Sequence, residues 1–314
     1  MRPSAIRFAT GALFLSHAGA TAAVAQGVAA PRVMAIVSQD ADPYQQALAG
    51  FRRELERANP GVTFDLILLH GDAGKLPEAL GAVTRTRPAL VLVLGTLATR
   101  EAVKQIRDIP IVAGMILNAG ELDRAANATG VYLEYPVQTE LEWLRRLLPA
   151  ERRVGVIYNS AENERRIGEA QRVAAAGDLS IQAIRVSGPE ELPDALMSLG
   201  NRADVLWGVA DPVVYNPETA RSLLLFSLRN RIPLIGQSTA WVKAGALYAL
   251  DRDYADVGAQ CAELAAKVLG GQSPSALPPA PPRKVRYAIN RRTAAEMKLH
   301  LPERVLGAAA EVVN

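Results

Sequence analysis

From residue 32 onward, short runs of β-branched and aliphatic residues alternate with longer amphipathic segments. The short runs are almost continuously apolar, as expected for strands that are covered on both faces of a parallel sheet. Alternation at this spacing predicts right-handed βαβ units and doubly wound sheets. We expect strands at 33–37, 63–69, 90–94, 109–115, 154–158, 180–186, 205–209, 233–235 and 285–289, and helices at 44–58, 139–148, 162–175, 217–229 and 254–269.

This series divides into two parts. One set of units runs from residue 32 to about 131, and a second starts near Tyr135 and repeats the design to about 240. Pro136 favours extended geometry at Tyr135, which suits a crossover. A chain of 314 residues also exceeds the usual size of one hydrophobic core. The predicted fold class is therefore α/β, with two doubly wound parallel-sheet lobes, and the proline-rich run at 270–282 is a stiff connector into the last strand.

The first 25 residues have the pattern of a secretory signal peptide. Arg2 and Arg7 precede a mostly apolar stretch at 8–20, and Ala23-Val24-Ala25 forms an A-x-A cleavage site. The apolar stretch is too short to span a bilayer. We expect cleavage after Ala25 and a periplasmic protein.

Charge and cysteine content exclude further classes. The chain has 35 basic and 32 acidic residues, a net charge of +3 that is dispersed along the sequence, which argues against a nucleic-acid partner. Cys261 is the one cysteine and falls in an alanine-rich helical run, so we expect a buried structural thiol. It lies far from the leader, so it cannot serve as a lipidated N-terminal cysteine.

Enzyme signatures are weak. The only histidines are His17, His70 and His300, and none belongs to a cluster with metal-ligand spacing. The sequence lacks the glycine motifs of nucleotide-binding loops, so we expect no metal and no cofactor. Residues 236–240 (GQSTA) resemble a nucleophile elbow around Ser238, which leaves a secreted serine hydrolase as an alternative to a helix-capping loop.

Polar and small residues recur immediately after the predicted strands. In doubly wound sheets, ligands bind outside the carboxyl ends of the strands. Such residues are also common helix caps, so each position alone is weak evidence, whereas their occurrence in both halves favours a binding site. The candidate ligand-binding residues are Ser38, Gln39, Gly95, Thr96, Asn118, Tyr158, Asn159, Ser160, Asp211 and Gln237.

Several segments together resemble the ABC-transporter substrate-binding proteins of the tryptophan/phenylalanine-binding type, which have the type I periplasmic binding protein fold. The matching segments cover almost the whole mature chain and lie at 32–51, 108–115, 129–149 (TGVYLEYPVQTELEWLRRLLP), 153–160 (RVGVIYNS), 211–238 and 244–258. The resemblance implies two lobes joined by a three-segment hinge. Lobe 1 would comprise 32–130 with 251–272, lobe 2 would comprise 135–247 with 283–300, and 301–314 would form a C-terminal tail.

The resemblance also implies a function. A small polar or zwitterionic solute, such as an amino acid, would be captured between the lobes and delivered to an ABC permease by a monomeric protein. A periplasmic protein that presents its ligand to a sensor kinase is the alternative. The segments at 223–227 and 288–299, together with Asp211-Pro212 and Gln237, depart from the amino-acid-binding members.

Roles for individual residues follow by analogy. Thr96, at a helix N-terminus, would bind a ligand carboxylate, with Asn159 and Ser160 holding the same anion from the second lobe. Asp211 would be the counter-charge for a ligand ammonium. Tyr158 would form an aromatic wall, with Trp207, Tyr215 and Trp241 behind it, whereas Trp143 would belong to the lobe core.

Overall fold

The computed structural model describes residues 30–314, so the expected signal peptide lies outside the described residues. The first lobe contains a sheet of five strands: β1 (Arg32–Val37), β2 (Thr63–Leu68), β3 (Leu90–Leu94), β4 (Ile111–Ile116) and β5 (Ala128–Tyr132). Their order is β2-β1-β3-β4-β5, and every neighbouring pair is parallel. Strands β1, β3 and β4 are apolar and buried on both faces, as their sequences predict.

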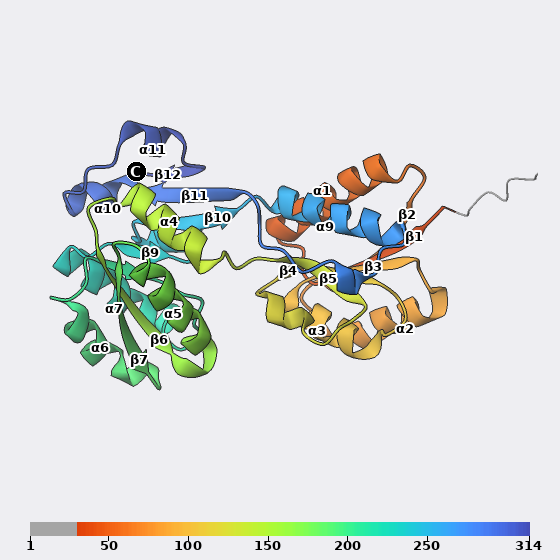
Figure 1. Ribbon diagram of the computed structural model, residues 1–314, viewed down its shortest axis with the longest axis horizontal. Helices are drawn as coiled ribbons and strands as arrows, with labels where there is room; N and C mark the ends of the chain where they lie inside the picture. The colour runs from red at the N-terminus through yellow and green to blue at the C-terminus, as the bar shows by residue number, and fades with distance from the viewer. Residues whose placement is uncertain (1–29) are drawn as a thin grey trace, which may run out of the picture. The chain divides into compact units, whose positions relative to one another are not determined.

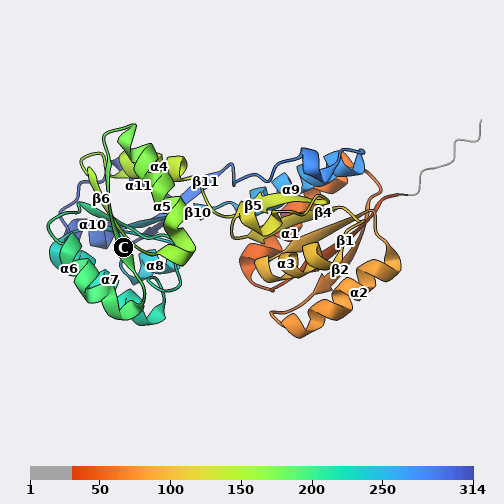
Figure 2. The same cartoon turned by 60° about the horizontal axis from the view of Figure 1, so that its bottom comes forward.

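Helices cover both faces of this first sheet (Figure 1). Helices α1 (Asp42–Ala58) and α9 (Tyr254–Leu269) lie side by side on one face, and α2 (Leu76–Thr86) and α3 (Thr96–Gln105) lie on the other, as the second view also shows (Figure 2). The alternation of side chains along β1 divides the core: Val33 and Val37 face α1 and α9, whereas Met34 and Ile36 face α2 and α3. Helix α9 therefore completes a core that begins more than 200 residues earlier.

The contact between α1 and α9 depends on two glycines. A Cβ atom at Gly50 would lie 2.0 Å from the carbonyl oxygen of Ala255, and one at Gly258 would lie 1.9 Å from the carbonyl oxygen of Ala47. No side chain fits at either position while the helices keep this approach. The two glycines thus set the distance between α1 and α9.

The second lobe contains a sheet of seven strands. These are β6 (Arg153–Asn159), β7 (Ser180–Val186), β8 (Val205–Trp207), β9 (Leu234–Gly236), β10 (Tyr248–Arg252), β11 (Val285–Asn290) and β12 (Glu311–Val313). The order is β12-β11-β10-β9-β8-β6-β7, and all neighbours are parallel except β10 and β11. The predicted α/β class with two parallel-sheet lobes is confirmed, and the one antiparallel pair comes from the returning strand β11.

The remaining helices belong to the second lobe or to short connections. The second lobe contains α4 (Val137–Leu147), α5 (Ser160–Ala175), α6 (Leu192–Leu199), α7 (Pro217–Asn230), α8 (Thr239–Ala244), α10 (Arg291–Glu296) and α11 (Glu303–Gly307). Single 3₁₀ turns occur at η1 (Ala73–Lys75), η2 (Ala119–Leu122), η3 (Pro189–Glu191) and η4 (Pro274–Ala276). Trp143 on α4 packs against the lobe core with its ring centroid 5.1 Å from that of Tyr287, as predicted.

Three strands are absent from the sequence prediction: β5, β10 and β12. Strand β10 includes Asp251 and Arg252, and β12 has only three residues, so neither has the continuous apolar run of a central strand. The proline-rich connector contains η4, and Ala280 forms an isolated parallel bridge with Val131. Strand β8 ends at Trp207, two residues earlier than expected.

Three chain segments join the lobes. The first runs from β5 to α4, the second from the end of β10 to α9, and the third from η4 to β11 (Figure 1). Tyr135, in the first segment, contacts the other two. Its hydroxyl lies 2.8 Å from the carbonyl oxygen of Asp251 and 2.9 Å from that of Lys284. These carbonyls belong to the second and third joining segments. Burial raises the pKa of the Tyr135 phenol, so this hydroxyl keeps its proton and remains a donor.

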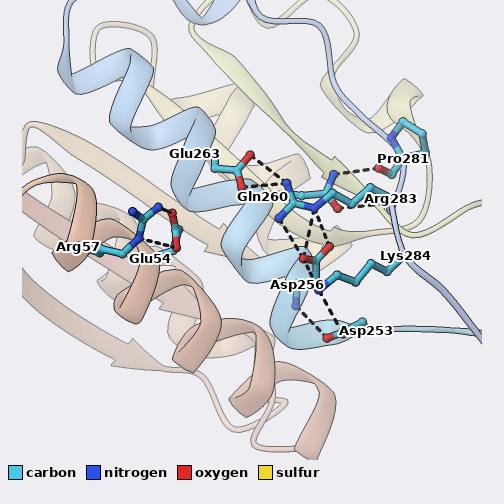
Figure 3. Close-up of polar contacts among 9 residues, drawn as sticks. All are labelled: Glu54, Arg57, Asp253, Asp256, Gln260, Glu263, Pro281, Arg283 and Lys284. Atoms are coloured by element: carbon cyan, nitrogen blue, oxygen red, sulfur yellow. Dashed lines mark hydrogen bonds and ion pairs between the residues drawn. The ribbon is translucent and has the colours of Figure 1, made fainter. Parts of the chain in front are cut away.

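An ionic cluster attaches the third joining segment to α9 (Figure 3). The Arg283 guanidinium donates to Asp256 at 2.9 Å and to Glu263 at 2.8 Å, and Lys284 pairs with Asp256 at 2.9 Å. Gln260 adds bonds to Pro281 and to the Arg283 amide. Arg283 is thus neutralised by two carboxylates.

Cys261 is fully buried in the first-lobe core, where its thiol contacts the carbonyl oxygen of Ala113 at 3.5 Å. Burial raises the pKa of the thiol to about 12. The predicted structural cysteine is confirmed. None of the helices within residues 30–314 combines the length and apolar character needed to cross a membrane.

Candidate functional site

The first-lobe pocket lies at the carboxyl ends of β1 and β3 and has a volume of about 220 Å³. Four of the predicted site residues line it: Ser38, Gln39, Gly95 and Thr96. The parallel sheet order places β1 and β3 next to each other, so the residues that follow them meet at one edge. The structure therefore brings these four together.

The N-terminus of α3 forms one wall of the first-lobe pocket. Gly95 precedes the helix with a φ of +119°, and a Cβ atom there would lie 2.3 Å from the Ser38 hydroxyl oxygen. That hydroxyl is buried and has no hydrogen-bond partner among the described residues. The Thr96 hydroxyl accepts a bond from the Leu117 amide at 3.2 Å, so its own proton remains free to donate.

Two exposed leucines lie beside Thr96. The side chain of Leu97 follows it in α3 and that of Leu117 follows β4, and these residues are 54% and 47% exposed. Large apolar side chains exposed next to polar donors are typical of sites that bind a ligand with an apolar body. The first lobe thus offers hydroxyl groups and apolar surface at the same edge.

The second-lobe pocket, named for the lobe that supplies most of its lining, has a volume of about 230 Å³ and lies at the carboxyl ends of β8, β9 and β10. Leu117 of the first lobe and Leu133 and Glu134, which follow β5, also line it. Its lining includes Glu140, Arg166, Trp207, Gln237, Tyr248 and Arg252. Of the ten candidate residues, only Gln237 lines it, and its amide nitrogen donates to the Val209 carbonyl. Glu140, Arg166 and Arg252 were missed because they lie on helices and on the unpredicted strand β10, not directly after a predicted strand.

Two partly buried ion pairs that share Arg166 form part of this second-lobe pocket. Arg166 contacts Glu140 at 2.8 Å and Glu134 at 2.9 Å, and the Trp207 indole donates to Glu140 at 2.9 Å. Burial raises the pKa of Glu140, against the opposing effect of Arg166 and Arg252. The Arg166 guanidinium also lies 5.5 Å from the centre of the Trp207 ring, which fixes the orientation of the indole.

Tyr158, Asn159 and Ser160 lie at the junction of β6 and α5, outside the lining of the second-lobe pocket. The Asn159 side chain caps α5 by accepting from the Ala161 amide at 3.0 Å, and its amide group donates to the Val186 carbonyl at 3.1 Å. Tyr158 is buried, with its hydroxyl 3.3 Å from Glu164. Tyr215 and Trp241 pack edge to face, 5.9 Å between centroids, and the Tyr215 hydroxyl donates to the Trp207 carbonyl.

Asp211 is 3% exposed and its carboxylate accepts four hydrogen bonds. The donors are the backbone amides of Asn159, Val213 and Val214 and the side-chain amide of Asn163. The expected role of this charge was to face a ligand ammonium, whereas in the structure it organises the loop after β8. Asn118 is similarly occupied, since it accepts from the Gly120 amide at 3.0 Å and begins η2.

Ser238 occupies the position that precedes α8, but its side chain makes no capping hydrogen bond. The strand-turn-helix context of the nucleophile elbow is present, since β9 ends at Gly236 and α8 begins at Thr239. His70 contacts Asp40 in the first lobe, whereas Ser238 belongs to the second. No group of three metal-ligating side chains occurs within residues 30–314.

Comparison with known proteins identifies the family. Residues 32–313 match the family model described as ABC transporter substrate binding protein. The chain belongs to this family. Its members bind solutes and are not catalytic, so the hydrolase alternative at Ser238 is set aside.

Individual relatives are more distant. A tyrosine-binding protein of Clostridioides difficile is 26% identical over 215 residues, which span 65% of this chain and 61% of that protein. An ABC domain of Streptococcus pneumoniae in complex with L-Trp matches with a TM-score of 0.62 and 21% identity, over 90% of this chain and 100% of that one.

The ligand-free, open structure of a substrate-binding protein with adhesive properties from Clostridium difficile matches with a TM-score of 0.76 and 20% identity. That match covers 90% of this chain and 99% of that one. At this level of identity, the two structural matches establish the periplasmic binding protein type I-like fold.

Proposed function

We propose that this protein captures an amino acid, with an aromatic amino acid as the leading candidate, and delivers it to an ABC permease. One observation carries the proposal: the second-lobe pocket combines the Trp207 indole with charged groups of both signs, Glu140 and the guanidinium groups of Arg166 and Arg252. Aromatic surface suits the body of such a ligand, and opposite charges suit its zwitterionic end.

The first-lobe pocket supports the same ligand class. Its free hydroxyl proton on Thr96 and the exposed Leu97 offer one polar and one apolar contact. A relative named for tyrosine binding and a structural match solved with L-Trp are consistent with this class.

The proposed mechanism is a shift between two states of the lobes. The two bodies that move are the first lobe with α9 and the second lobe with β11, and the ligand contacts both only in the closed state. A ligand shifts such an equilibrium only by its difference in affinity for the two states. Contacts on one lobe alone would therefore not close the protein.

The proposal extends to location and partner. We propose that the chain is exported to the periplasm, that its leader is removed after Ala25, and that the mature protein meets its permease at the inner membrane. Intact-mass measurement of the exported protein tests the cleavage site, because a mature chain that begins at Gln26 has one defined mass.

Ligand binding is tested by calorimetry and thermal unfolding with L-tryptophan, L-tyrosine and L-phenylalanine, with D-ribose and myo-inositol as comparison solutes. A ligand at 100 times its Kd stabilises the folded state by about 2.7 kcal/mol. We expect at least one aromatic amino acid to do so and neither comparison solute. Stabilisation by a sugar or polyol alone would overturn the proposed ligand class.

The contribution of the first lobe is tested with Thr96→Ala. We expect this change to weaken binding about fivefold to tenfold, because it removes one hydroxyl donor. Thr84→Ala is the matched control, since the Thr84 hydroxyl bonds within α2 to Leu80 and lines neither pocket. Equal affinities of the two variants would exclude Thr96 from the site.

A further inference from the structure

The two guanidinium groups in the second-lobe pocket differ in their partners. Arg166 is 14% exposed at its side chain and pairs with both Glu134 and Glu140. Its Nη2 also donates to the Tyr135 carbonyl oxygen at 3.3 Å. The positive charge of Arg166 is therefore compensated within the protein, with one carboxylate in excess.

Arg252 lines the same pocket without a carboxylate partner. Its Nε donates to the Leu133 carbonyl at 2.9 Å, and its Nη1 approaches the Leu250 carbonyl at 3.3 Å. Among the ion pairs formed within residues 30–314, none includes Arg252. The guanidinium is thus held by neutral carbonyls and forms no ion pair, although its charge opposes the rise in the pKa of Glu140.

The neighbouring acid does not supply the missing partner. The Asp251 carboxylate accepts from the backbone amide of Arg252 at 2.8 Å and lies 3.4 Å from the Thr239 hydroxyl. Arg283, in another joining segment, shows the contrast, since it pairs with Asp256 and Glu263. A guanidinium carries five N–H donors, and the two contacts of Arg252 leave three of them without a partner.

The orientation of Arg252 is also fixed. Its guanidinium carbon lies 5.1 Å from the centre of the Tyr135 ring, and the two carbonyl contacts restrict it further. An oriented, unpaired guanidinium at the edge of a pocket matches the geometry of a carboxylate, which it can bind through two parallel hydrogen bonds.

Resting on the function proposed above, we propose that Arg252 binds the carboxylate of the ligand and makes the site selective for amino acids over their uncharged or decarboxylated analogues. The resemblance to known substrate-binding proteins places the ligand anion at Thr96, Asn159 and Ser160, but the Asn159 side chain is occupied as a helix cap. Arg252 is also the last residue of β10, immediately before the chain continues into α9. The ligand carboxylate would therefore contact a segment that joins the lobes.

The test compares L-tryptophan and L-tyrosine with L-tryptophanamide and L-tyrosinamide. Each amide keeps the ring and the ammonium but lacks the negative charge. We expect the wild-type protein to prefer the acid by tenfold or more, and Arg252→Gln to lose roughly tenfold to a hundredfold in affinity for the acid with little change for the amide. Arg252→Lys should restore part of the preference, because it restores the charge without the paired donors.

Arg286→Gln is the matched control. Arg286 is exposed on β11 and lies opposite Asp251 in the strand ladder, so the substitution removes a nearby positive charge that does not line the pocket. Its acid-to-amide preference should equal that of the wild type.

The outcomes separate the two proposals. If the wild type binds an aromatic amino acid and Arg252→Gln binds it equally well, or weakens acid and amide by the same factor, Arg252 has only a structural role and the inference is overturned. If the wild type binds none of the common amino acids, the proposed function fails and the inference fails with it.

Discussion

The carboxylate of Asp211 accepts a hydrogen bond from the backbone amide of Asn159 at 2.6 Å, which ties the loop after β8 to the end of β6. Three further donors reach the same carboxylate. Because the charge is buried and its acceptor positions are filled, Asp211 is a structural residue of the second lobe.

Replacing Asp211 with Asn should therefore reduce the free energy of unfolding by about 2 to 4 kcal/mol, because charge-assisted bonds weaken and an amide donor meets other donors. Urea unfolding measures the change. Glu56→Gln, on the exposed surface of α1, removes one negative charge without these contacts and should leave the midpoint unchanged. An unchanged midpoint for Asp211→Asn would contradict the structural role.

Replacing a glycine with alanine should have opposite effects on stability at the contact between α1 and α9 and in α5. Gly258→Ala should destabilise the protein by about 3 kcal/mol, because the new Cβ atom meets the Ala47 carbonyl and the two backbones must separate. Gly168→Ala meets no atom within 4 Å and should stabilise α5 by about 0.5 to 1 kcal/mol. Thermal unfolding measures the change in Tm of both variants. Changes of the same sign would contradict the proposed close packing at Gly258.

Removal of the Tyr135 hydroxyl should loosen the joining segments. Tyr135→Phe loses the donor shared by Asp251 and Lys284, and we expect about 1 kcal/mol less stability together with faster hydrogen exchange in all three segments. Tyr132→Phe is the control, because Tyr132 is only partly buried at the end of β5. Hydrogen exchange confined to the segment that contains Tyr135 would exclude the proposed link among the three.

The ionic cluster around Asp256 predicts a dependence of stability on pH. Burial alone would raise the pKa of Asp256, but the bonds from Arg283 and Lys284 outweigh it, and the net pKa lies below its ordinary value of 3.8. A carboxyl group with a lowered folded-state pKa stabilises the protein above its unfolded-state pKa and loses this contribution as the pH falls toward the folded-state value.

The stability difference between the wild type and Asp256→Asn should therefore be largest near pH 7 and shrink below about pH 4. Urea unfolding at pH 7, 4 and 3 measures it. A difference that stays constant over this range would show that the ionised form of Asp256 makes no net contribution.

The sequence predicts the central elements of the fold well and its edges poorly. The strand at 90–94 and the helix at 254–269 have the bounds expected, because a fully buried strand and a long amphipathic helix carry continuous patterns. Strand β10 was missed because Asp251 and Arg252 interrupt its apolar character where it leaves the core. A strand that ends in polar residues of a joining segment lacks the continuous apolar pattern by which strands are predicted.

The candidate site residues also differ in how well the sequence predicts them. Residues after β1 and β3, such as Thr96, could be located from the predicted sheet, and they line the first-lobe pocket. Asn159 and Asp211, which follow β6 and β8, line neither pocket. Arg166 and Glu140 could not, because they come from α5 and α4 and meet only when these helices pack. The burial that makes Asp211 structural likewise depends on Asn163, a helical residue that sequence order does not relate to it.

The pairing of α1 with α9 affects how the chain acquires its structure during synthesis and export. The first lobe lacks one of its helices until residue 269 is available, even though its first strand begins at residue 32. A nascent chain that carries only the first five strands lacks the helix that covers β4, β5 and the side of α1 around Gly50. We expect such a chain to remain incompletely folded, and therefore threadable through a translocation channel, until most of the polypeptide has been made.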